Sequence, residues 1–423
     1  MGEVNRYSGL WQKEYFYVDE QNELKSTRLN IFNRIFRKCF GTKESTQISK
    51  LIRCLRFKKN LTEKEEKILT FALEKFKGKY SVDPAVLFAP NGISNFGCNC
   101  YAISTLQAFL VSPVVKSLIN QPKEIPAPVK SELESEEAFS RRVKFYEEDR
   151  EKLKFVREKL KVLIEDLSNP RKTTYELGSS LQVFINEIFE KNINETFSPH
   201  HSYEQQDAMD FCSLILESIG YSFNLQTKRV GQYEVENSDN PLITEFSTEE
   251  IVRLQVFPLA IEENDDASQS FYSLLQSDIN KAEKSSENTW RVEYQGKEVK
   301  LEKFDITMRV SNKEPVDFIC FHLKKYGFDK KSLPYMIEKK FELESPVIDL
   351  RPLLSSESDQ PILYRLVSCV DHSGKSTNSG HYTSHIYKDG FWFYCNDGSV
   401  TPCTFEDVIN KNNYLFMFER VID

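Results

Sequence analysis

The chain has 423 residues, with 56 basic and 64 acidic side chains and a formal net charge of −8. Hydrophobic residues make up 40% of it and aromatic residues 13%, which excludes disordered and fibrous proteins and predicts a large core. The acidic balance argues against a nucleic-acid-binding protein. The sequence has no apolar run long enough to cross a membrane and no basic head before an apolar stretch, so we expect neither a membrane span nor a Sec-type signal peptide.

The nine cysteines are an odd number and are scattered along the chain, which favours free thiols in a reducing compartment and hence a cytoplasmic location. Cys98 and Cys100 lie two residues apart, which is not the C-x-x-C spacing of a zinc site, so we expect no metal and no cofactor. The frequent use of Lys, Asn, Ile and Phe hints at an AT-rich genome. A secreted effector of an intracellular bacterium, acting in the host cytoplasm, is an alternative source.

Residues 1–85 are expected to form a helical extension. A capping box of Thr62 and Glu65 begins an amphipathic helix that ends near Gly78. The preceding residues 28–59 are locally basic. This pattern is typical of a solvated helix face, and the alternative is a docking surface for an acidic partner or a membrane.

Residues 86–225 are expected to be mainly helical. Ser131 and Glu134 form a second capping box, and apolar residues then recur at helical spacing through 129–166. This predicts a long amphipathic helix, broken at most once, that packs on the domain by its apolar stripe. A partner-binding helix is the alternative. The stripe consists of Phe139, Val143, Tyr146, Leu153, Val156, Leu160 and Leu163.

Residues 226–315 change to strand patterns, with a hairpin expected around the Gln295-Gly296 turn and loops at 262–269 and 282–288. Residues 316–423 are expected to be rich in strands. Their five candidates are DFICFHL, YRLVSCV, HYTSHIY, FWFYC and NYLFMFERV.

Cys100 follows a turn rich in Gly and Asn and stands where the apolar helix YAISTLQAFL should begin. A thiol at a helix start lies in the positive end of the helix dipole, which favours the nucleophilic thiolate. Because free cysteines usually serve only in packing, this segment alone is weak support for catalysis.

A second segment carries a candidate base. His381 follows Gly380 at the start of a strand, and the next apolar strand ends at Asn396 and Asp397. Two adjacent antiparallel strands would place one of these two side chains beside the imidazole. A helix-borne cysteine, a strand-borne histidine and an orienting amide or carboxylate form a thiol hydrolase site.

A third segment, from Tyr203 onward, is expected to be a helix with Asp207 and Asp210 on one face beside amide side chains such as that of Gln206. Such a face suits an extended cationic ligand. The alternative is that the two carboxylates only stabilise the start of their own helix.

Together these residues resemble the ubiquitin-specific proteases, which are papain-like cysteine peptidases. The family's Cys box, G-L-x-N-x-G-N-T-C-Y-x-N-x-x-L-Q, is matched at Gly92, Asn95, Gly97, Cys100, Tyr101, Leu106 and Gln107. Further segments resemble the family's Q-Q-D box, its H-L-K-R-F stretch, its His box and its final strands. They are Gln205–Asp207, Phe321–Tyr326, His372–Gly374, Gly380–Tyr382, Trp392–Asp397 and Tyr414–Phe418.

The resemblance covers about residues 90–423 and implies a fold and a substrate. The fold is α+β and papain-like, with a thumb (86–225), fingers (226–315) and a palm (316–423) after the 1–85 extension. The implied activity is cleavage of the isopeptide bond after the C-terminal glycine of ubiquitin. Two alternatives remain open: the same chemistry on another modifier, such as a SUMO-like protein, and a catalytically silent ubiquitin-binding module.

The resemblance also implies a role for each matching residue. Cys100 is the nucleophile, His381 the base, and Asn396 the residue that orients the imidazole, with Asp397 supporting it or standing in for it. Asn95 donates its amide to the oxyanion, together with the backbone N–H of Cys100. On the substrate side, Gln206, Asp207 and Asp210 hold ubiquitin's Leu-Arg-Gly-Gly tail, and Tyr382 forms a wall of the narrow channel for the two glycines.

Four departures from the family pattern stand out. Cys98-Asn99 replaces the Asn-Thr that precedes the nucleophile, and Lys325-Tyr326 replaces Arg-Phe. Asp210 stands where relatives have Glu. Residues 226–315 contain neither cysteine nor histidine, so the fingers cannot hold the four-cysteine zinc site that many relatives have.

Overall fold

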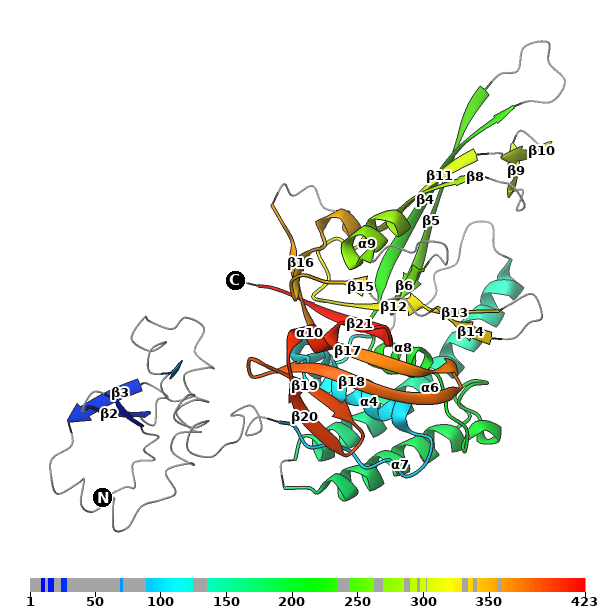
Figure 1. Ribbon diagram of the computed structural model, residues 1–423. Coiled ribbons are helices and arrows are strands. Elements are labelled where there is room, and N and C mark those ends of the chain that lie inside the picture. Colours follow the sequence, from blue (N-terminus) through cyan, green and yellow to red (C-terminus); the bar gives the residue numbers. More distant parts are fainter. Residues whose placement is uncertain are drawn as a thin grey trace. The chain divides into compact units, whose positions relative to one another are not determined.

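The computed structural model of the chain is shown in Figure 1. It describes residues 9–11, 14–18, 24–28, 69–70, 89–124, 135–169, 171–234, 243–261, 269–284, 290–294, 297–301, 303–328, 334–337, 341–355 and 360–422. The chain divides into two compact units. One contains residues 1–90, 387–393 and 400–404, and the other contains 91–386, 394–399 and 405–423. Each unit is described by itself.

The N-terminal stretch contains three antiparallel strands, β1 (Gly9–Trp11), β2 (Glu14–Val18) and β3 (Leu24–Arg28), in the order β1-β2-β3. The expectation of a helical extension is therefore wrong for these residues. Tyr15, Phe16 and Tyr17 follow one another in β2, and aromatic residues favour strands. The capping box at Thr62 and the basic residues 29–59 lie outside the described residues.

Five α-helices are found among the described residues between 100 and 218. They are α4 (Cys100–Leu110), α5 (Pro113–Asn120), α6 (Glu136–Leu167), α7 (Thr174–Glu190) and α8 (Ala208–Ser218). A 3₁₀ turn, η2 (Pro199–His201), precedes α8. In Figure 1, α4 lies between the strands β17 and β18 and the outer helix α7. Ten of the eleven residues of α4 are buried, so the helix that begins at Cys100 is a fixed part of the core.

The long helix α6 confirms the predicted amphipathic stretch as one unbroken helix of 32 residues. The C-terminal half of its stripe is buried, with Leu153, Val156, Leu160 and Leu163 at most 7% exposed, and α6 packs on α7 and α8. The N-terminal half of the stripe, with Phe139, Val143 and Tyr146, is only half-buried. The capping box at Ser131 lies outside the described residues.

Among the described residues, a four-stranded antiparallel sheet has the order β5-β4-β11-β8. Its strands are β4 (Phe223–Glu234), β5 (Ile243–Leu254), β11 (Lys303–Val310) and β8 (Asn280–Lys284). Residues 282–284 therefore lie in a strand, where a loop was expected. The predicted hairpin is confirmed: β9 (Trp290–Tyr294) pairs with β10 (Lys297–Leu301), and Tyr294 lies opposite Lys297.

A larger sheet contains eight of the described strands, in the order β20-β19-β18-β17-β21-β12-β6, with β16 paired to β17. All five predicted C-terminal strands are found in it. The bounds are β6 (Phe257–Ala260), β12 (Phe318–Lys324), β16 (Val347–Asp349), β17 (Leu363–Ser376), β18 (Ser379–Lys388), β19 (Phe391–Asn396), β20 (Ser399–Cys403) and β21 (Asn413–Arg420).

The strand β6 comes from the stretch expected to form the fingers, yet it pairs in parallel with β12 in the larger sheet. The helix α9 (Phe271–Ile279) packs against β6 and against the 3₁₀ turn η3 (Arg351–Leu353). A short helix, α10 (Phe405–Val408), precedes β21 in the chain. Two short strand pairs complete the described elements: β13 (Tyr326–Phe328) with β14 (Pro334–Met336), and β15 (Phe341–Glu342) with β7 (Gln269–Ser270). The predicted boundaries of extension, thumb, fingers and palm stay predictions.

Candidate active site

Cys100 is the first residue of α4 and is 3% exposed. The loop before it is shaped by Asn95, whose Oδ1 accepts hydrogen bonds from the backbone N–H groups of Gly97 and Asn99, both at 3.2 Å. Cys98 lies in this loop and is exposed. The structure thus separates the two neighbouring thiols: one is seated at the helix start, and the other faces solvent.

The sulfur of Cys100 lies 3.8 Å from Oε1 of Gln205. Burial raises the pKa of the thiol, while hydrogen bonds from the backbone of Tyr382 and Tyr101 lower it. Burial outweighs the other effects, so the pKa is raised rather than lowered. The backbone N–H groups at the helix start favour the thiolate, as expected, but burial outweighs them, so the thiol needs a base to ionise it.

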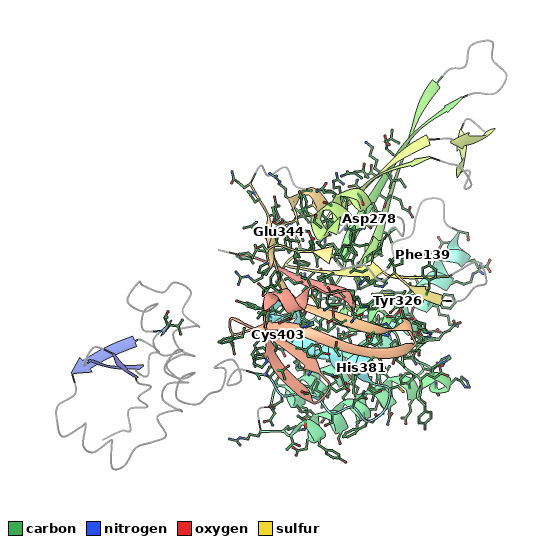
Figure 2. All side chains as sticks on the ribbon, viewed as in Figure 1. Phe139, Asp278, Tyr326, Glu344, His381 and Cys403 are labelled. Carbon is green, nitrogen blue, oxygen red and sulfur yellow. The ribbon has the colours of Figure 1, made fainter. Side chains whose placement is uncertain are left out.

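His381 lies near the start of β18, and Asn396 ends the neighbouring strand β19. The distance between Nε2 of His381 and Oδ1 of Asn396 is 2.8 Å. Because an amide oxygen only accepts, Nε2 donates this hydrogen bond, and in the neutral imidazole Nδ1 is then the nitrogen that can accept a proton. His381 is followed directly by Tyr382, whose backbone hydrogen-bonds to the sulfur of Cys100. Figure 2 shows His381 between the strands and the helices beneath them.

Asp397 has a different partner from Asn396. It occupies a turn with φ of 50°, and its Oδ2 accepts a hydrogen bond from Nδ2 of Asn95 at 3.3 Å. Its carbonyl oxygen accepts from the backbone of Ile93 at 3.0 Å and from Nε2 of Gln107 at 3.4 Å. Burial raises the pKa of Asp397, and both Asn95 and His381 act to lower it. Asp397 therefore positions the loop that carries Asn95.

Gly92 allows this close approach. A Cβ at position 92 would lie 2.2 Å from the carbonyl oxygen of Gly398, so only glycine fits without moving the backbone. The Asp397-Gly398 turn and the 91–95 segment are thereby held together in front of α4.

Asp207 is the N-cap of α8, and its Oδ1 accepts from the backbone N–H of Met209 at 2.7 Å. The hydroxyl of Tyr414 donates to the same carboxylate, 2.8 Å from each oxygen. Burial raises the pKa of Asp207 to about 6 against these hydrogen bonds. The helix was expected to include residues 203–207 but begins at Ala208, because the Asp207 side chain caps it there.

Asp210 lies in the first turn of α8, and burial raises its pKa as well. The two carboxylates are thus one turn apart, as the spacing predicts. The cap contact shows that Asp207 has a structural role, and its role in substrate binding stays a prediction.

Gln206 is placed differently from the expectation. Its Nε2 donates to the backbone carbonyls of His201 and Glu204, both at 3.0 Å, and its side chain is buried in that turn. The amide that reaches the nucleophile belongs to Gln205, whose Nε2 also donates to the carbonyl of Thr377 at 3.1 Å. Nothing in the local pattern of the Gln-Gln pair tells which amide faces the nucleophile, and the role of Gln206 in holding the tail stays a prediction.

Tyr382 is 1% exposed, and its hydroxyl donates to the carbonyl of Thr377 at 3.0 Å. Its ring stacks on that of His372, with centroids 4.1 Å apart. The hydroxyl of Tyr326 hydrogen-bonds Nδ1 of His372, and burial lowers the pKa of His372 to about 4. The rings of Tyr326, Tyr382 and Tyr414 lie around this neutral histidine.

The sequence did not single out Gln205, Thr377, His372 or Tyr414 as site residues. Three of them lie inside segments that carry the family resemblance, which was the available signal. Thr377 acts through its backbone carbonyl, and such a contact leaves no trace in a sequence.

Among the described residues, no group of three or more His, Cys, Asp or Glu side chains is placed to hold a metal ion. In the same part of the chain, no single helix is long and apolar enough to span a membrane. α4 and α5 meet the criterion only as a pair, bent by 98°.

A cysteine at a buried helix start, with a histidine and an asparagine on neighbouring strands of a mainly antiparallel sheet, defines a papain-like α+β fold. The ubiquitin carboxyl-terminal hydrolase family model matches residues 91–418, and the chain belongs to this family.

Known proteins agree with this assignment. The chain is 25% identical over 237 residues to ubiquitin carboxyl-terminal hydrolase 17-like protein C of Mus musculus, a match that covers 53% of this chain and 42% of the mouse protein. It is 35% identical over 105 residues to ubiquitin carboxyl-terminal hydrolase 36 of Drosophila simulans, a match that covers 24% of this chain and 10% of the fly protein. The match thus spans less than half the length of the mouse relative.

A solved structure has a similar fold. It is described as the SAGA Ubp8/Sgf11/Sus1/Sgf73 DUB module bound to ubiquitin aldehyde. The TM-score is 0.53 at 16% identity, and the match covers 84% of this chain and 76% of that one. At this identity the likeness concerns the fold alone.

Proposed function

We propose that this chain is a thiol-dependent deubiquitinating hydrolase that cleaves the isopeptide bond after the C-terminal glycine of ubiquitin. The observation that carries the proposal is the hydrogen bond between Nε2 of His381 and Oδ1 of Asn396, together with the contact of the next residue, Tyr382, whose backbone hydrogen-bonds to the sulfur of Cys100 at the start of α4. We infer that Nδ1 of His381 serves as the base for the thiol of Cys100. Family membership supplies the substrate class.

In the proposed reaction, Nδ1 of His381 takes the proton of Cys100, and the thiolate attacks the carbonyl carbon of the terminal glycine. The imidazolium then gives its proton to the leaving lysine amine, and the C–N bond breaks to leave a thioester. A water molecule, deprotonated by His381, attacks the thioester and releases ubiquitin, and Cys100 recovers its proton.

Asn95 is suited to stabilise the oxyanion. Its NH₂ group has two hydrogens, of which one is directed to Asp397. The second is available for the oxygen that becomes negative, together with the backbone N–H of Cys100. We therefore assign Asp397 to positioning Asn95 and Asn396 to orienting His381.

The proposed tail channel runs past Asp207, Asp210 and Tyr382. Two carboxylates whose pKa values are raised by burial gain from a cationic partner, because the positive charge favours their ionised form. The arginines of a Leu-Arg-Gly-Gly tail provide that charge. Family resemblance does not distinguish ubiquitin from a related modifier with a similar tail, so the modifier is part of the proposal.

The test is hydrolysis of ubiquitin that carries a fluorescent amine at its C-terminus, compared with a SUMO-like protein carrying the same group. We expect turnover of the ubiquitin substrate by the wild-type chain and none by Cys100→Ala. Turnover of the SUMO-like substrate alone would show that the modifier is a SUMO-like protein and not ubiquitin. A folded wild-type chain inactive on both would support a silent binding module instead.

We also propose a cytoplasmic location, supported by the free thiols of Cys98, Cys100, Cys212, Cys320 and Cys369. Fractionation of cells that express the tagged chain tests it, and recovery in the secreted or membrane fraction would contradict it.

A further inference from the structure

An exposed aromatic pair lies beside the nucleophile loop. The rings of Phe96 and Tyr175 meet edge to face, with centroids 4.9 Å apart and planes at 66°. Their side chains are 40% and 66% exposed. Large aromatic rings dominate the energetics of protein interfaces, so two adjacent exposed rings mark a candidate contact surface.

The pair is held in place by backbone contacts. The N–H of Ser94 donates to the carbonyl of Thr174 at 3.0 Å, which ties the loop to the start of α7. Gly178, inside α7, lies directly under the loop. A Cβ there would lie 2.3 Å from the carbonyl oxygen of Ser94 and 2.9 Å from the ring of Phe96. A glycine within a helix is unfavourable, so here close loop packing offsets that cost.

Two hydrogen-bonded networks around Cys100 indicate on which side of the nucleophile the aromatic pair lies. On one side, Gln205 and Tyr382 both bond to the carbonyl of Thr377, and Asp207 also bonds to Thr377. This is the side of the proposed ubiquitin tail. The second network joins Asn95 to Asp397 and His381 to Asn396.

Phe96 directly follows Asn95 in the second network. Because the tail occupies the first network, the amine leaves toward the second, where His381 protonates it. The aromatic pair therefore borders the path of the leaving group.

We propose that Phe96 and Tyr175 form a platform for the polypeptide that bears the modified lysine, and that they contact apolar side chains flanking that lysine. This inference rests on the proposed function. Its support is the continuity of the rings with the nucleophile loop, their exposure, and the rigid seating provided by Gly178.

Two isopeptide substrates test the platform. In both, ubiquitin is joined to the lysine of a short peptide, and the lysine is flanked by leucines in one and by glycines in the other. We expect the wild-type chain to cleave the leucine substrate with kcat/KM roughly 10-fold higher, the scale on which burial of part of one apolar side chain acts. Phe96→Ala and Tyr175→Ala should each lose most of this preference.

Three controls sharpen the experiment. Phe96→Tyr keeps a ring and should keep the preference. Val183→Ala removes an exposed apolar side chain from α7 two turns further along the helix than Tyr175 and should change nothing. Hydrolysis of ubiquitin carrying only a fluorescent amine should be unchanged in all these variants, because that substrate lacks flanking residues.

Equal rates on the two peptides by the wild-type chain would overturn the platform. A parallel loss on every substrate in Phe96→Ala would also overturn it, because the ring would then only support the fold of the loop. A wild-type chain inactive even on the fluorescent amine would instead remove the proposed function, and the platform with it.

Discussion

Asn396 and Asp397 are adjacent in the sequence yet contact different partners. Asn396 bonds to His381, whereas Asp397 bonds to Asn95. The sequence left open which of the two orients the imidazole. Asp397 stands in a turn with a φ of 50°, and its carboxylate accepts the hydrogen bond of Asn95 in the nucleophile loop.

Asn396→Ala should lower kcat by roughly 10–10³-fold, the scale on which orienting groups matter. Asp397→Ala should lower kcat by a smaller factor, because Asp397 acts only by positioning Asn95. The double variant Asn95→Ala/Asp397→Ala should therefore be no slower than Asn95→Ala alone, which a double-mutant cycle on a ubiquitin fluorescent amine measures. Fully additive losses would show that Asp397 acts independently of Asn95.

Asp207 should make stability depend on pH. Its pKa is raised from 3.8 to about 6, so between these values the folded chain keeps a proton that the unfolded chain has released. Stability from this group is fully present below about pH 4 and falls as pH rises through 6. Asp207→Asn still caps α8 but cannot titrate.

The free energy of unfolding, measured by urea titration from pH 4 to 7, should fall more in the wild-type chain than in Asp207→Asn. The difference in unfolding free energy between the wild type and Asp207→Asn should change by about 3 kcal/mol from pH 4 to 7. This follows from a pKa shift of about two units at about 1.4 kcal/mol per unit. A difference that stays constant over this range would show that the carboxylate does not titrate there.

At the scale of elements, hydrophobic periodicity predicted the C-terminal strands and the helix α6, because their side-chain patterns reflect one buried face. Periodicity failed where a single side chain sets the start of a helix, as Asp207 does by capping α8. It also failed at the N-terminus, where strands such as the aromatic-rich β2 stand in place of the expected helix. The pairing of β6 with β12 was also invisible, since parallel pairing joins segments far apart in sequence.

Gly178→Ala should destabilise the chain although alanine is the better helix former. In an exposed helix this change stabilises by about 1 kcal/mol. Here the added Cβ would lie 2.3 Å from the carbonyl oxygen of Ser94, so we expect a net loss of about 1–3 kcal/mol. Urea unfolding measures it.

Ser179→Ala, at the next and exposed position of the same helix, is the matched control and should change stability by less than about 0.5 kcal/mol. A Gly178→Ala variant as stable as the wild type would mean that the loop does not pack tightly on α7.

At the scale of the whole molecule, the family and the α+β fold class were predicted from ordered motifs and are confirmed by the family match and the structural likeness. These motifs lie far apart in the chain, and only the fold brings Cys100, His381 and Asn396 into one site. The division into extension, thumb, fingers and palm, and the roles of individual site residues, stay predictions.

The fingers should need no zinc, because residues 226–315 lack cysteine and histidine. Treatment of the purified chain with a chelator should leave both its melting temperature and its activity unchanged. Elemental analysis should find less than stoichiometric zinc. Zinc at one equivalent per chain, lost together with activity on chelation, would contradict this prediction.

The central claim is that Cys100 attacks the C-terminus of ubiquitin. Ubiquitin carrying an electrophile in place of its terminal carboxylate tests it most directly, with the modified residue located by mass spectrometry of the digested adduct. The account predicts one ubiquitin per chain, attached at Cys100, with labelling abolished in Cys100→Ala and kept in Cys98→Ala. Attachment at Cys98, or no adduct on a folded wild-type chain, would contradict it.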